Sequence, residues 1–184
     1  NAGKNDQATQ ALMALAQQRS YYGFMAADTL GLPYAFSHRN TPADELLLEE
    51  LAGKQELFRA GELFATGLYT RGRQEWDEVI RKLSPTEQIQ ASILAHRMGW
   101  HSRAIATAAR QRLYDDLELR YPPAFFELFK TSSDQAGISV NWAMGIARSE
   151  SLFMPDVKSR AGALGLMQLM PATGAATARE FQIR

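Results

Sequence analysis

Hydrophobic residues recur along most of the chain at spacings of three and four positions, and strict alternation of apolar and polar residues is rare. The first pattern places apolar side chains on one face of a helix, whereas the second would indicate half-buried strands. No apolar run approaches the roughly 20 residues that a membrane-spanning helix requires. The pattern therefore predicts an all-α protein without a membrane span.

Three local signals predict where helices begin. Ser20 provides an N-cap for a helix that Gly31 ends. Proline is tolerated at the first helical position, so Thr41-Pro42 predicts a second start. Residues 84–87, Ser-Pro-Thr-Glu, have the form of a capping box, in which the serine oxygen accepts from the N3 amide and the glutamate reaches back.

Residues 68–76 and 95–103 resemble each other loosely. In each segment we expect one helix to end, the chain to turn at a glycine (Gly72 or Gly99), and another helix to begin. Because a single helix hairpin cannot bury its apolar face alone, repeated hairpins usually stack side by side. We therefore expect residues 1–115 to form a superhelical array of short helix hairpins.

The pattern changes after the acidic stretch 114–118, where consecutive prolines at 122–123 disfavour a continuous helix. This change predicts a second domain over residues 116–184.

Three helices are predicted in the second domain. One begins at Pro123 and ends at Gly137, one begins at the cap Ser139, and one begins at Pro171.

Composition narrows the possible chemistry. Lys+Arg and Asp+Glu both number 20, so the net charge is near zero. This balance argues against non-specific nucleic-acid binding, which requires an excess of basic residues. Cysteine is absent, which excludes disulfides and thiolate chemistry. The three histidines (His38, His96 and His101) lack metal-ligand spacing, so we expect no metal and no cofactor. Because the chain opens on Asn1 without a signal peptide, we expect it to be an interior piece of a longer precursor.

The predicted helix from Ser139 carries the strongest candidate for chemistry, Glu150. It lies seven residues after Ala143, four after Ile146 and three after Ala147, so it shares a helical face with apolar side chains. It also lies in the last turn, where the negative end of the helix dipole disfavours an anion. Loss of water beside apolar side chains and the helix dipole both raise the pKa of a carboxyl group, and a general acid needs a raised pKa to stay protonated. A frayed, exposed helix end explains this segment equally well.

A glycine-punctuated loop follows, from Ser159 to Met170. Gly162 and Gly165 allow a ligand to approach the backbone closely, and the Gln168 amide offers both a donor and an acceptor. Taken alone, this loop also fits a tight turn whose methionines fill the core.

Together these segments resemble the first two motifs of the soluble lytic murein transglycosylase family. The matching stretches are Ala-Arg-Ser-Glu-Ser at 147–151, Val-Lys-Ser at 157–159 and Gly-Ala-Leu-Gly-Leu-Met-Gln-Leu-Met-Pro-Ala-Thr at 162–173. The resemblance covers residues 120–184 well and extends more weakly backward. It implies a superhelical array of short helices followed by a lysozyme-like α domain.

The resemblance implies a lytic transglycosylase that acts on peptidoglycan without a cofactor. Glu150 matches the residue that, in the family, protonates the glycosidic oxygen between N-acetylmuramic acid and N-acetylglucosamine. The same residue then takes the proton of the muramic acid C6 hydroxyl, which closes on C1 to form a 1,6-anhydro sugar. Ser151 matches the serine that supports the acid at the substrate site, and Ser159, Gln168 and Met170 match residues that contact the glycan.

One motif carboxylate distinguishes this chemistry from ordinary glycoside hydrolysis, which uses two. Asp156 lies six residues after Glu150, but its place beside Pro155 favours a solvated turn residue over a second catalytic group.

The family's third and fourth motifs, an Ala-Tyr-Asn-type segment and a later tyrosine, do not occur before Arg184. We therefore expect the lysozyme-like domain to be truncated, and we assign the activity to the longer parent protein. A goose-type muramidase and a non-catalytic peptidoglycan-binding scaffold stay open as alternatives. The resemblance also implies a periplasmic location and peptidoglycan glycan strands as partners, and it leaves other cell-wall enzymes open as further partners.

Overall fold

The computed structural model describes residues 2–182, and this part of the chain contains the helices α1–α11 and no strand. The prediction of an all-α protein is therefore confirmed. Within the same residues, no helix is long and apolar enough to cross a membrane. The chain forms two compact units, Asn1–Asn40 and Thr41–Arg184.

The first unit is a helix hairpin. Helix α1 (Ala2–Ala16) packs against α2 (Tyr21–Leu30) around three buried alanines. The predicted cap is confirmed, because Ser20 Oγ accepts a hydrogen bond from the Gly23 amide at 3.0 Å. Gly31 ends α2 in the left-handed conformation, with φ of 65°.

The second unit begins with an extended segment, so the helix start predicted at Thr41-Pro42 is wrong. Helix α3 (Glu45–Gly53) starts later because Asp44 is its N-cap, and the Asp44 carboxylate accepts from the α3 backbone at 3.1 Å. The Thr41 amide instead donates to the buried Asp116 carboxylate at 2.7 Å. This long-range hydrogen bond holds the segment extended, and no local pattern reveals it.

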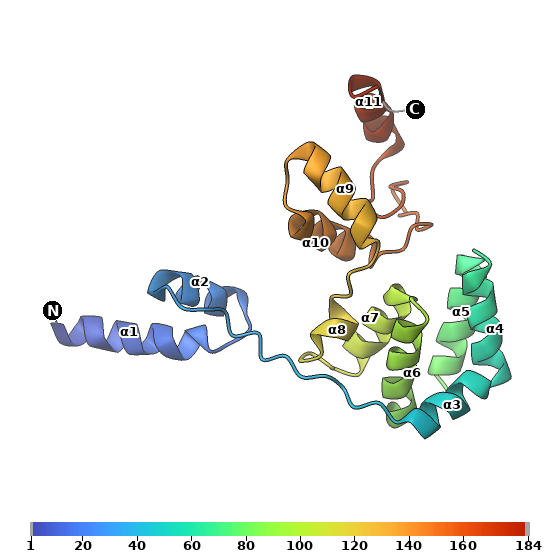
Figure 1. The fold of residues 1–184 in the computed structure, drawn as a ribbon, viewed down its shortest axis with the longest axis horizontal. Coiled ribbons are helices and arrows are strands. Elements are labelled where there is room, and N and C mark those ends of the chain that lie inside the picture. The colour runs from blue at the N-terminus through green and yellow to red at the C-terminus, as the bar shows by residue number, and fades with distance from the viewer. Residues whose placement is uncertain (1, 183–184) are drawn as a thin grey trace. The chain divides into compact units, whose positions relative to one another are not determined.

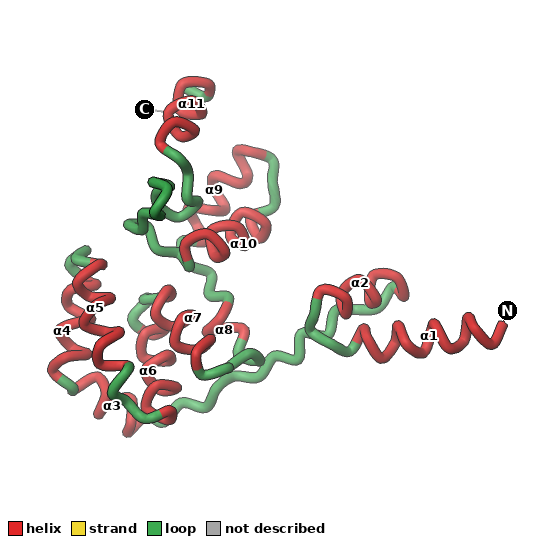
Figure 2. Tube along the Cα trace, turned by 180° about the vertical axis from the view of Figure 1, so that it is seen from behind, coloured by secondary structure: helices red, strands yellow, loops and turns green. Residues whose placement is uncertain are grey.

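Four helices then form two neighbouring hairpins. Helix α4 (Gln55–Ala65) pairs with α5 (Tyr69–Ile80), and α6 (Pro85–Arg97) pairs with α7 (His101–Arg110), as Figures 1 and 2 show. The predicted hairpin repeat is thus confirmed in this part of the chain.

The glycines assigned to the two turns need one correction. Gly99 turns the second hairpin as predicted, with φ of 71°, but Gly67 turns the first, with φ of 79°. Gly72 instead lies inside α5, where an added Cβ would lie 3.1 Å from the Ala60 carbonyl oxygen and 3.2 Å from the Trp100 ring. Gly72 therefore permits close packing of α5 against α4 and against Trp100, and it is not a turn residue.

Trp100 joins the two hairpins through a shared core. Its side chain is buried and stacks on Phe64, with ring centres 4.6 Å apart and planes 13° apart. Its ring centre also lies 5.4 Å from that of the buried Trp76. Buried residues from α3 to α7 complete this cluster, namely Leu51, Leu57, Ala60, Ile80, Ala91, Ala95 and Ala104.

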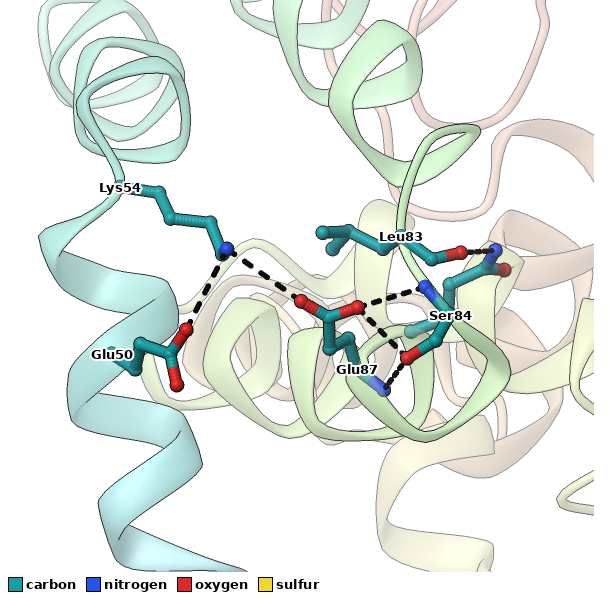
Figure 3. A network of polar contacts seen from close by, with 6 residues as sticks. Glu50, Lys54, Leu83, Ser84 and Glu87 are labelled. Atoms are coloured by element: carbon teal, nitrogen blue, oxygen red, sulfur yellow. Dashed lines mark hydrogen bonds and ion pairs between the residues drawn. The ribbon is translucent and has the colours of Figure 1, made fainter.

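The capping box at the start of α6 is confirmed, and it also reaches α3 (Figure 3). Ser84 Oγ accepts from the Glu87 amide at 3.3 Å, and Glu87 Oε2 accepts from the Ser84 amide at 2.8 Å. Lys54 Nζ lies 3.6 Å from Glu87 and 3.7 Å from Glu50. The hydrogen bonds from Ser84 and the charge of Lys54 hold the pKa of Glu87 below its usual value.

The hairpins are followed by a short helix α8 (Leu117–Arg120) and the predicted break at the prolines. Helix α9 (Phe126–Ala136) begins later than predicted, because Phe125 has a left-handed backbone, with φ of 55°, that a right-handed helix cannot contain. Gly137 ends α9 as expected, with φ of 65°.

Helices α10 (Val140–Ser151) and α11 (Pro171–Glu180) begin where the sequence predicts. Helix α10 packs beside α9, and Figure 1 shows the pair together. Their shared core contains Ile105, Ala124, Phe129, Ala143, Ala147 and Phe153. Because Ile105 belongs to α7, this core continues into the hairpin array, and the domain boundary before residue 116 stays a prediction.

Candidate active site

Glu150 lies in the last turn of α10, as the sequence predicts. The buried face of the helix, however, is formed by Ala143, Ala147 and Ser151, which follow one another at four-residue spacing. Glu150 lies at the edge of this face and is exposed. Of the two interpretations that the sequence left open for Glu150, an apolar surrounding and an exposed helix end, the structure has the exposed one.

The chain reverses direction directly after Glu150 and Ser151. Leu152 and Phe153 are both left-handed, with φ of 51° and 60°. Two consecutive residues of this kind end the helix sharply and bury the Phe153 side chain against the α9–α10 core. Glu150 therefore lies at a helix end, and the packing of Phe153 fixes the direction in which the chain leaves that end.

Ser151 follows Glu150 in the chain, but its side chain is buried in the protein. Its Oγ lies 2.9 Å from the Leu166 carbonyl oxygen and 3.0 Å from the Ala147 carbonyl oxygen. A hydroxyl has one proton, so the two acceptors share it. This geometry favours a role in joining α10 to the following loop, and direct contact of Ser151 with substrate stays a prediction.

The loop between α10 and α11 is held by its own hydrogen bonds. Ser159 Oγ accepts from the Ala163 amide at 3.0 Å, and the amides of Leu164 and Leu169 each donate to the other residue's carbonyl oxygen at 2.9 and 3.1 Å. Gly162 and Gly165 have φ of 97° and 71°, which glycine adopts without strain. The loop is therefore a defined structure that could present side chains to a ligand.

Gln168 is tied into this loop through its amide nitrogen. Nε2 donates to the Gly165 carbonyl at 2.9 Å and to the Val157 carbonyl at 3.3 Å. Its backbone is left-handed, with φ of 48°, an unfavourable conformation for a residue with a side chain. The side-chain oxygen Oε1 is the atom that Gln168 can offer to a glycan hydroxyl or amide.

The remaining predicted contact residue, Met170, precedes the first residue of α11 and is 43% exposed. Met170 is therefore accessible to a ligand, as a glycan contact would require. Glu150, Ser159, Gln168 and Met170 thus all lie between the last turn of α10 and the start of α11, and Ser151 contacts the same segment through the Leu166 carbonyl.

Asp156 is engaged by a residue that sequence analysis did not connect with the site. Arg73 of α5 forms two hydrogen bonds of 2.7 Å to its carboxylate oxygens. Hydrogen bonding and charge from Arg73 hold the pKa of Asp156 below its usual value. Both oxygens of the Asp156 carboxylate accept hydrogen bonds from Arg73, so this carboxylate is poorly placed to act as a second catalytic base or nucleophile. Arg73 and Asp156 are 83 positions apart in the chain, and neither local sequence predicts their pairing.

Two cavities flank the end of α10. One, of about 200 Å³, is lined by residues of the hairpin array and of the segment after α10, including Tyr69, Trp100 and His101. The other, of about 250 Å³, lies beside Tyr121 and Arg148. Glu150 lines neither cavity.

Among the described residues, no group of three or more His, Cys, Asp or Glu side chains could hold a metal ion.

Two family models match the chain. Residues 50–117 match the soluble lytic murein transglycosylase L domain, and residues 127–184 match the transglycosylase SLT domain. The first match contains the hairpins α4–α7, and the second contains α10 with the loop that follows it.

Curated relatives extend the similarity over nearly the whole chain. Soluble lytic murein transglycosylases of Salmonella typhimurium and Escherichia coli are each 35% identical over 181 residues, which is 98% of this chain and 28% of each relative. A putative soluble lytic murein transglycosylase of Haemophilus influenzae is 33% identical over 95% of the chain. The chain therefore spans less than a third of the length of these relatives.

Solved structures agree with this similarity. The 70 kDa soluble lytic transglycosylase of Escherichia coli matches with a TM-score of 0.90 and 35% identity, covering 99% of this chain and 29% of that one. An inactive glutamate-to-glutamine mutant of the lytic transglycosylase Slt of Pseudomonas aeruginosa matches with a TM-score of 0.85 and 35% identity, covering 96% and 29%. A complex of the 70 kDa enzyme with bulgecin A matches with a TM-score of 0.88.

Proposed function

Since this chain belongs to the soluble lytic murein transglycosylase family, we propose that the protein carrying it is a peptidoglycan lytic transglycosylase. It cleaves the β-1,4 bond between N-acetylmuramic acid and N-acetylglucosamine and leaves 1,6-anhydromuramic ends. The observation that carries this proposal is Glu150, a single carboxylate at the end of α10, joined within a few residues to an ordered loop that bears Gln168.

Glu150 acts first as an acid and then as a base. It protonates the leaving glycosidic oxygen, and the resulting carboxylate removes the proton from the C6 hydroxyl of the muramic acid. The C6 oxygen then bonds to C1, so no water enters the product. This sequence needs one carboxylate, and the engagement of Asp156 by Arg73 supports that count. The inactive glutamate-to-glutamine mutant of the Pseudomonas aeruginosa enzyme supports an essential glutamate in that relative.

The loop residues hold the glycan. Ser159, Gln168 and Met170 contact the sugar chain, and Ser151 supports the loop from behind through the Leu166 carbonyl. Because Glu150 is exposed at the edge of its helix, the bound glycan and the rest of the full-length protein complete its surroundings. The substrate is a cell-wall polymer, which favours a periplasmic location.

The test is mass spectrometry of products released from purified murein sacculi by the full-length protein that carries this chain and by its Glu150→Gln variant. Anhydro-muropeptides from the parent and none from the variant are expected. Reducing ends would indicate a goose-type muramidase instead. A folded protein that binds sacculi but releases nothing would identify a non-catalytic scaffold. Glu127→Gln, a glutamate on α9 outside both motifs, is the matched control and should leave the products unchanged.

A further inference from the structure

The pair formed by Arg73 and Asp156 joins the hairpin array to the loop that follows Glu150. Arg73 Nη1 donates to Asp156 Oδ1 and Nη2 donates to Oδ2, each at 2.7 Å, so the guanidinium holds the carboxylate with two parallel hydrogen bonds. Paired charge-assisted hydrogen bonds of this kind fix orientation as well as distance.

The pair is partly shielded and has a third partner. The Arg73 and Asp156 side chains are only 16% and 25% exposed. Thr70, one turn before Arg73 on α5, accepts from Arg73 Nη2 at 3.1 Å and donates to Asp156 Oδ2 at 3.4 Å. A surface ion pair between mobile side chains contributes little, whereas shielding and fixed geometry strengthen this one.

Asp156 is connected to Gln168 through the residue that follows it. The Val157 carbonyl accepts from the Gly165 amide at 3.0 Å and from Gln168 Nε2 at 3.3 Å. A shift of the backbone at residues 156–157 therefore moves the acceptor that holds both Gly165 and Gln168. The contacts form an unbroken chain from α5 to the loop residue predicted to bind the glycan.

We infer that Arg73 is a positioning residue for the loop 157–169, acting through Asp156, so that the hairpin array holds the glycan-binding loop in its working conformation. The kinetic consequence of this inference rests on the proposed function, but the structural consequence does not.

The chain contains a matched control for a purely stabilising ion pair. Arg59 of α4 donates to Glu75 of α5 at 2.6 and 3.2 Å, so it is also an arginine–carboxylate pair with short contacts. That pair lies wholly within the first hairpin and has no role in the chain of contacts to Gln168.

The first experiment measures hydrogen exchange in the full-length protein that carries this chain. In Arg73→Ala, peptides spanning 157–169 should exchange at least roughly tenfold faster, because the substitution removes both charge-assisted hydrogen bonds to Asp156. The same peptides should be unchanged in Arg59→Ala. Unchanged exchange of this loop in Arg73→Ala, in a protein that remains folded, would overturn the inference.

The second experiment measures turnover of murein at saturating concentration, well below the melting temperature of each variant. Arg73→Ala and Asp156→Asn should each lower kcat by about tenfold, because a small misplacement of groups that orient the substrate slows the reacting step. The double variant should be no worse than either one, because all three remove the same ion pair. Arg59→Ala should retain parental turnover. Full kcat in both Arg73→Ala and Asp156→Asn would show a merely structural pair. An inactive parent would contradict the proposed function, while the exchange experiment would still decide the positioning role.

Discussion

Replacing Ser151 by alanine tests how the helix that bears Glu150 is joined to the loop. The substitution removes one buried hydroxyl and leaves the helix backbone free to keep its conformation. The hydroxyl is shared between the carbonyl oxygens of Ala147 and Leu166, at 3.0 and 2.9 Å. Ala147 belongs to the same helix as Ser151, so the hydrogen bond that joins α10 to the loop is the one to Leu166.

The expected cost follows from that geometry. Since the single proton serves two acceptors, the variant loses one hydrogen bond rather than two. A typical intramolecular hydrogen bond contributes about 1 kcal/mol, and an unsatisfied buried partner adds to the loss. Leu166 is only partly buried, so water can replace part of the lost bond. We therefore expect Ser151→Ala to reduce local stability by about 1–2 kcal/mol.

Native-state hydrogen exchange measures this local free energy. A loss of that size makes local opening roughly 5 to 30 times more frequent, so peptides covering the end of α10 and the loop around Leu166 should exchange faster by that factor. Ser149→Ala is the control, because Ser149 is exposed on the same helix and its replacement should change stability by less than about 0.5 kcal/mol. Equal exchange in the two variants would refute a joining role for the Ser151 hydroxyl.

Three further predictions concern the hairpin array. Asp44→Ala should lower the stability of α3 by about 1 kcal/mol through loss of its N-cap, and hydrogen exchange should become faster in that helix alone. Asp44→Asn keeps a capping oxygen, so it should retain most of this stability. Trp100→Ala should cost about 3–5 kcal/mol in urea denaturation, whereas Trp142→Ala, at a 62% exposed site, should cost little; equal losses would contradict the assigned core. Burial, followed by the charge of His96, lowers the pKa of His101 in the folded protein. At a pH between the folded and the unfolded pKa, the unfolded chain binds more protons than the folded one. The folded protein therefore becomes less stable as the pH falls through this range. Urea midpoints at pH 7 and pH 5 should therefore differ less in His101→Gln than in the parent; an unchanged difference would exclude His101 as the source.

The sequence determined those features whose causes lie within a few residues. Helical periodicity predicted the all-α fold, and side chains that bond to nearby amides predicted the caps at Ser20 and at Ser84 with Glu87. The same locality explains why Glu150 could be predicted as the candidate acid, since the motif of its helix end and loop lies within one short stretch.

Only the tertiary structure decided features that depend on residues far apart in the chain. Thr41 stays extended because its amide bonds to Asp116, 75 residues away. Asp156 is bound by Arg73 because α5, which carries Arg73, packs beside it in the folded protein, although the two residues are 83 positions apart. Glu150 is exposed because packing buries the neighbouring face of α10, which spacing along one helix could not reveal. Local hydrogen bonds are encoded where they form, whereas burial and long-range ion pairs exist only once the chain has packed.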